Sequence, residues 1–74
     1  MSEWINVDYR LPAEPSGDVV FEQRDYLVSD GEMVGKCDFQ RGNGAGKPWA
    51  NWGAYGDIRP EFITHWMPLP EPPK

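Results

Sequence analysis

The sequence contains few of the residues that cross-link small domains or hold metal ions. Its 74 residues include one cysteine, Cys37, and one histidine, His65. A single cysteine cannot form an internal disulfide, and these two residues cannot supply the four Cys or His ligands of a closed zinc site. We therefore expect no metal site and no cofactor. Four Trp, three Tyr and three Phe are available to build the core instead.

Long apolar runs and basic residues are also scarce. No stretch approaches the roughly 20 apolar residues of a membrane span, and the N-terminus lacks the basic and apolar regions of a signal peptide. The net charge is -5, and residues 1–40 carry nine acidic against three basic side chains. Nucleic acids and anionic membranes attract Lys and Arg, so this charge disfavours both as direct partners. We expect a cytoplasmic protein.

The length permits one small domain, residues 1–74, and the residue pattern predicts a mainly β fold with an antiparallel sheet. Asp30-Gly31 lies between two alternating segments and predicts a hairpin with a type I′ turn, in which both central residues have positive φ. Residues 41–48 contain three glycines and predict a flexible glycine-rich loop. No segment has the periodicity of a long amphipathic helix.

The C-terminal third contains three further signals. Pro60 favours one helical turn within residues 57–62, and residues 63–67 predict the last strand. The proline-rich tail, residues 68–74, favours polyproline II. The predicted core comprises Trp4, Ile5, Leu11, Val20, Tyr26, Val28, Met33, Cys37, Phe39, Phe62, Ile63 and Trp66.

Both ends of the chain carry recognisable motifs. These are Trp4-Ile5 and Arg10-Leu11-Pro12 at the start, and Thr-His-Trp-Met-Pro-Leu-Pro-Glu-Pro-Pro over residues 64–73 at the end. With them the chain resembles a small phage and prophage family, catalogued as domain of unknown function 551. The resemblance implies an accessory protein of a phage or integrated prophage in a bacterial host, and it implies no catalytic activity. It assigns nothing to residues 39–57.

Three features could suggest catalysis or nucleotide binding, and each has a simpler interpretation. The glycines before Lys47 lack the spacing of a phosphate-binding loop, and Pro48 stands where that motif requires Ser or Thr. His65 has no recognisable orienting acid or nucleophile, and its alternation with Ile63 suggests a packed histidine that bonds to backbone. Cys37 lies on the predicted inner face as a small buried hydrophobe. We expect a protein that is not an enzyme and has no catalytic residues.

The favoured hypothesis is protein–protein interaction through the aromatic segment. Trp49, Trp52 and Tyr55 recur at every third residue and could form one platform, to which Asn43 and Lys47 would add polar contacts. Trp and Tyr are enriched at interface hot spots. The same rings could instead form the core of so small a chain. The predicted partner is a host or phage protein, and the chain could be a monomer or a homodimer.

The alternative hypothesis is mimicry of nucleic acid. A row of carboxylates can imitate phosphates and so inhibit a host complex that binds DNA or RNA, such as a defence system. The ordinary interpretation is that such acids keep a small domain soluble. The candidate acidic surface comprises Asp18, Glu22, Asp25, Asp30, Glu32 and Asp38.

Overall fold

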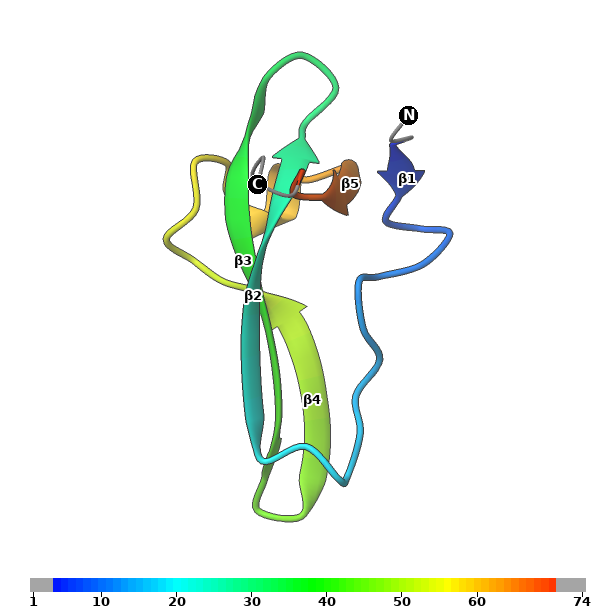
Figure 1. Cartoon of the computed structure of the whole chain (residues 1–74), viewed down its shortest axis with the longest axis vertical. Helices are drawn as coiled ribbons and strands as arrows, with labels where there is room; N and C mark the ends of the chain where they lie inside the picture. The colour runs from blue at the N-terminus through cyan, green and yellow to red at the C-terminus, as the bar shows by residue number, and fades with distance from the viewer. Residues whose placement is uncertain (1–3, 71–74) are drawn as a thin grey trace.

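The chain forms an antiparallel sheet of five strands in the order β1-β5-β2-β3-β4, as the computed structural model of residues 4–70 shows (Figure 1). The strands are β1 (Ile5–Asn6), β2 (Phe21–Ser29), β3 (Val34–Gly44), β4 (Lys47–Trp52) and β5 (His65–Pro68). In the described part, helical structure is limited to the 3-10 turn η1 (Pro60–Phe62), and no helix there is long and apolar enough to cross a membrane. The predicted mainly β fold is confirmed.

The long β2–β3 hairpin is the scaffold of the sheet. Its strands pair from Phe21 opposite Gly42 to Ser29 opposite Val34. Strand β5 adds to β2 only at the end near the first turn, over residues 26–29. Strand β4 adds to β3 only at the other end, over residues 39–44. Each end of the hairpin therefore has a different third strand within the same sheet (Figure 1).

The predicted hairpin at Asp30-Gly31 is present, but its turn is not type I′. Residues 30–33 form a four-residue connection in which Gly31, at φ 102°, is the residue with positive φ. The Asp30 carboxylate accepts hydrogen bonds from the backbone N–H groups of Glu32 and Met33, at 2.8 and 2.7 Å. The acid therefore stabilises a longer turn through its side chain.

The prediction of a flexible glycine-rich loop over residues 41–48 is wrong. Strand β3 continues to Gly44 and β4 begins at Lys47, so only Ala45 and Gly46 remain as the connection. Their φ angles of 53° and 78° give the two positive values of a type I′ turn. The glycines at 42 and 44 thus lie in a strand, where the absence of a side chain leaves room for a neighbour.

The core lies on one face of the sheet and holds most of the predicted residues. Its fully buried members are Val28, Cys37, Phe39, Ile58, Ile63 and Trp66. Around it, Tyr26 packs edge to face against both Trp66 and Trp52, with ring centroids 5.4 and 6.1 Å apart. Ile58 was not in the predicted core, whereas Trp52 agrees with the alternative that rings of the aromatic segment form part of the core. Ile58 comes from a loop, and its direction is set by the path of the loop rather than by strand alternation.

Five residues of the predicted core are exposed. Val20 and Met33 lie just outside the strand ends, where alternation no longer fixes the direction of a side chain. Phe62 lies in η1 and points outward. More than a third of the surface of each remains in contact with solvent: Trp4 41%, Leu11 39%, Val20 88%, Met33 60% and Phe62 57%.

The helical turn and the last strand of the C-terminal third are confirmed in type and corrected in extent. The helical turn at Pro60 is present as η1. The last strand begins at His65, two residues later than predicted, and includes Pro68. Residues 71–74 of the proline-rich tail lie outside the described residues.

Candidate interaction surface

One face of the sheet is covered by the chain's own N-terminal segment. Residues 7–20, which connect β1 to β2 in the chain, run along the hairpin (Figure 1). Three side chains of the sheet donate hydrogen bonds to backbone carbonyls of this segment: Trp66 Nε1 to Arg10 at 2.9 Å, Arg41 Nη1 to Glu14 at 3.0 Å and Asn43 Nδ2 to Gly17 at 3.0 Å. These bonds are spread along the sheet and hold the segment over the side that bears the core, which we call the covered face.

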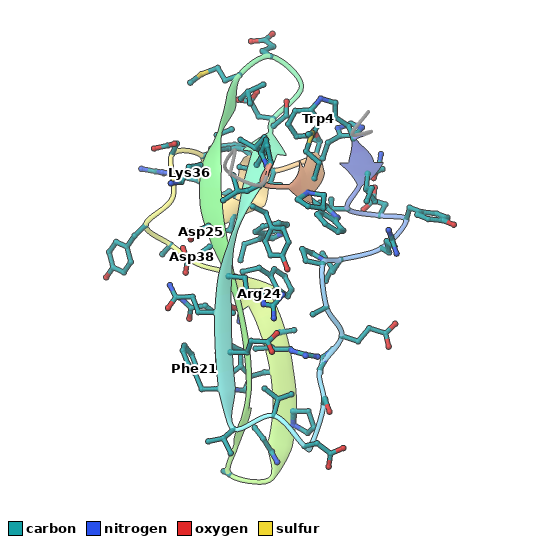
Figure 2. The ribbon with its side chains drawn as sticks, viewed as in Figure 1. Trp4, Phe21, Arg24, Asp25, Lys36 and Asp38 are labelled. Carbon is teal, nitrogen blue, oxygen red and sulfur yellow. The ribbon has the colours of Figure 1, made fainter. Side chains whose placement is uncertain are left out.

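The opposite side, which we call the open face, carries the other set of alternating side chains. Figure 2 shows Phe21, Asp25, Asp38 and Lys36 on one side of the hairpin, while Arg24 points to the other side. The register places Gln40 and Trp49 on the open face as well, since partners opposite each other in a sheet share a face.

An aromatic pair lies on the open face near the turn at Ala45-Gly46. Phe21, Gly42 and Trp49 are opposite one another on the three neighbouring strands β2, β3 and β4. The rings of Phe21 and Trp49 have centroids 6.3 Å apart at an angle of 49°. A Cβ added at Gly42 would lie 3.1 Å from the Trp49 indole, so the glycine makes room for that ring. Phe21 nevertheless remains 58% exposed.

Amide side chains form the next row of the open face, beside the aromatic pair. Gln23, Gln40 and Asn51 are opposite one another on the same three strands. The side-chain amides of both glutamines donate hydrogen bonds to the Asp38 carboxylate. The open face therefore places a pair of aromatic rings beside a row of amides, two of which are fixed by the Asp38 carboxylate.

The acidic end of the open face comprises Asp25 and Asp38, which lie directly opposite each other on β2 and β3. Like charges in such cross-strand positions are destabilising. Both line a hollow of about 320 Å³ between the hairpin and the loop after β4, together with Lys36, Cys37, Tyr55, Gly56 and Asp57. No group of three His, Cys, Asp or Glu side chains among the described residues is arranged to hold a metal ion.

Cys37 lies at the inner side of this hollow and is buried, as predicted from its alternation. Burial raises the pKa of its thiol, and the negative charge of Asp38 raises it further. The Sγ atom lies 3.4 Å from the carbonyl of Gly53, which it contacts as a weak donor. A thiol with a raised pKa carries little thiolate at neutral pH, so the site is poorly suited to nucleophilic attack.

His65 is half-buried, and its partner differs from the backbone group that we predicted. Its Nδ1 is hydrogen-bonded to the side-chain hydroxyl of Thr64 at 2.8 Å. That hydroxyl in turn donates to the carbonyl of Ser29, at 3.2 Å. The imidazole therefore belongs to a small hydrogen-bonded group that joins β5 to β2.

The three aromatics of the predicted platform do not share a surface. Trp49 lies on the open face, whereas Trp52, three residues later on the same strand, faces the core with Phe39 and Tyr26. Tyr55 is 98% exposed on the loop after β4. Asn43 faces the covered side, and Lys47 occupies the open face beside the turn.

The six acids of the alternative surface also fail to form one row. Asp25 and Asp38 share the open face, but Glu22 is on the covered face in an ion pair with Arg41 at 3.1 Å. Asp30 is used within its own turn, where hydrogen bonds from Met33 and Glu32 lower the pKa of its carboxyl. Glu32 lies in the same turn, and Asp18 lies in the N-terminal segment.

The sequence analysis missed several residues of the open face. Phe21, Gln23, Gln40 and Asn51 were not singled out as candidates. Strand alternation alone places Phe21 and Gln23 on one face, so that signal was available. The interpretation of residues 41–48 as a loop hid the pairing that brings Trp49 to Phe21.

These features define a small β-sheet domain with one face covered by its own chain and one face open. Over residues 3–74 the chain matches the family described as protein of unknown function (DUF551). It therefore belongs to this family, and the resemblance noted at its two ends is confirmed at the level of the family. No curated protein matches the chain, and no solved structure matches it.

Proposed function

We propose that this protein is a non-enzymatic accessory factor of a phage or integrated prophage that binds another protein in the cytoplasm of the bacterial host. The contact surface is the open face, with Phe21 and Trp49 at its centre. The observation that supports the proposal is the aromatic pair of exposed Phe21 and half-buried Trp49 on a face that the chain leaves uncovered. Aromatic rings of this kind dominate the energetics of protein interfaces.

The acidic-mimic alternative has narrower support. Asp25 and Asp38 lie together on the open face, but the other four candidate acids are distributed over the covered face, a turn and the N-terminal segment. Inhibition of a host DNA- or RNA-binding complex would then depend on this one acidic pair. Such binding would weaken steeply as salt rises, whereas aromatic contacts persist.

A pull-down from bacterial lysate with matched variants tests the proposal. The tagged protein is washed at about 0.1 M and about 1 M salt, between which the screening length falls from about 10 Å to about 3 Å. We expect a host or phage protein to remain bound at high salt and to be lost with Phe21→Ala and Trp49→Ala. Truncation of a hot-spot ring costs 2 kcal/mol or more, which is about a thirtyfold loss of affinity.

Tyr9→Ala is the matched control, because it removes an aromatic side chain that is even more exposed but lies in the N-terminal segment, away from the open face. This variant is expected to retain the partner. If the Trp49→Ala protein, shown to be folded by circular dichroism, captures the same partner as the wild type, the open face is not the contact surface. A partner that is retained only at low salt and lost with Asp25→Lys would favour the acidic-mimic alternative.

A further inference from the structure

Four consecutive rows of the open face follow an order that is complementary to itself when it is reversed; the next row, Leu27 with Lys36, lies beyond them. The order runs along the hairpin from the turn at Ala45-Gly46 towards the turn at residues 30–33. Each step is one row of residues that are opposite one another on neighbouring strands. The rows are Lys47 with Gly44; Phe21, Gly42 and Trp49; Gln23, Gln40 and Asn51; and Asp25 with Asp38.

Arg41 marks the midpoint of these rows, although its own side chain lies on the covered face. Gly44, which is opposite Lys47, and Asp38 are each three residues from Arg41 along β3. At about 3.4 Å per residue, the positive row and the acidic row lie about 10 Å on either side of it. Consider an axis that is parallel to the face, perpendicular to the strands and level with Arg41. Rotation by 180° about this axis places the positive row of a second copy over the acidic row of the first, and its acidic row over the positive row.

We propose that the open face binds a second copy of this chain through such a two-fold axis, with the strands of the two copies antiparallel. The proposal rests on the proposed function in taking the open face as the contact surface, and it adds a second copy of the chain as an occupant of that surface. Lys47 of each copy meets the acidic row of the other. The aromatic row of each copy packs on the amide row of the other. Every contact occurs twice, as a two-fold interface requires.

Charge selects this orientation over the other face-to-face arrangement. A two-fold axis parallel to the strands would place the row that contains Lys47 over the same row of the second copy, and the acidic row over the acidic row. Like charges brought together in this way cost binding energy. In the antiparallel arrangement Lys47 lies over Gly53, which follows β4 and donates its N–H to the Asp38 carbonyl at 2.7 Å. Because Gly53 has no side chain, the lysine can reach the Asp38 carboxylate beside it.

The size of the face predicts a weak and reversible dimer. Three strands about 4.8 Å apart and about 20 Å long give a footprint of roughly 300 Å². Stable interfaces usually bury about 800 Å² on each partner. Self-association should therefore depend on protein concentration, and a protein partner could displace the second copy.

Sedimentation velocity on the whole chain between about 10 µM and about 1 mM tests the dimer, since weak complexes dissociate across this range. We expect the sedimentation coefficient of the wild type to rise with concentration. Lys47→Glu and Asp38→Lys should each weaken association about tenfold or more, because each change places like charges together at this contact twice. The double variant restores opposite charges and should recover association to within about threefold of the wild type.

Two controls separate the contact from net charge and from folding. Arg24→Glu makes the same charge change as Lys47→Glu, but on the covered face, and should associate like the wild type. Glu32→Lys, in the hairpin turn, controls in the same way for Asp38→Lys. The Asp38→Lys substitution also removes the repulsion with Asp25 within one chain. Circular dichroism checks that each variant is folded before its association is compared.

The dimer is overturned if the wild type is monomeric throughout, if either single reversal associates like the wild type, or if the double variant fails to recover. A monomeric chain whose capture of a host protein still requires Trp49 would overturn the dimer and leave the proposed function intact. If the chain dimerises with these charge effects but captures a host protein equally well with Trp49→Ala, the dimer stands and the proposed function is overturned.

Discussion

Truncation of Val28 should remove a large part of the stability of this domain. Val28 is fully buried at the centre of the core, with 0% of its surface exposed. Val28→Ala deletes two methyl groups, and about 0.8 kcal/mol for each gives about 1.6 kcal/mol of lost transfer free energy. A residual cavity of about 40 Å³ adds about 1 kcal/mol at about 24 cal/mol per Å³. The expected loss is therefore about 2.5 kcal/mol.

The total free energy of unfolding of a chain of this length is of the order of 4 to 11 kcal/mol, so the variant should fold with a much reduced urea midpoint. Val34→Ala is the matched control, because Val34 begins the other strand of the same hairpin and is 61% exposed. Both changes lose the same β-branched side chain, and only the burial differs. Urea unfolding followed by tryptophan fluorescence measures both. A loss below 1 kcal/mol for Val28→Ala, or equal losses for the two variants, would refute this account of the core.

Three further predictions concern the loop after β4 and the hairpin turn. Gly56→Ala should lower the free energy of unfolding by about 1–3 kcal/mol, because the new Cβ would lie 2.8 Å from the Cys37 backbone. Gly17→Ala is the control, because nothing lies within 4 Å of its new Cβ, and it should change that free energy by no more than about 0.5 kcal/mol in the same urea titration. The Cys37 thiol should be unreactive towards a chromogenic disulfide reagent in the native protein and become reactive in urea, and rapid native labelling would contradict its burial. The folded-state pKa of Asp30 is lowered by hydrogen bonds in its turn, so its stabilising effect is complete above the unfolded value of 3.8 and is lost as pH falls through the folded value. Asp30→Ala should therefore lower the urea midpoint at pH 7 more than at pH 2, and equal effects at both would contradict this linkage.

Local sequence chemistry determined the type of most elements. The alternation of residues 35–39 predicted that Cys37 and Phe39 face inward, and both are buried. The hairpin turn at Asp30-Gly31 and the helical turn at Pro60 were predicted at the right positions. Each of these signals depends only on neighbouring residues, because a turn needs particular φ angles and a strand repeats every two residues.

Glycine content misled the prediction over residues 41–48, for a reason that lies outside the segment. Glycine in isolation favours a flexible loop, but Gly42 is held in β3 between Phe21 and Trp49 on its two neighbouring strands. Glycine within a strand is destabilising, and packing of the Trp49 indole in the space of the missing side chain offsets that loss of stability. Because the indole comes from a neighbouring strand, a prediction based on adjacent residues alone cannot include this effect.

The candidate interaction surface likewise depends partly on local sequence and partly on tertiary contacts. The sequence by itself determined that the protein is a small acidic β-domain of its family, and it predicted aromatic residues as contacts. Only the tertiary structure decided where the aromatics lie: Trp49 is with Phe21 on the open face, Trp52 faces the core and Tyr55 is exposed on a loop. The direction of each ring depends on strand register and on the path of residues 7–20 across the other face. Both are fixed by contacts between residues far apart in the chain.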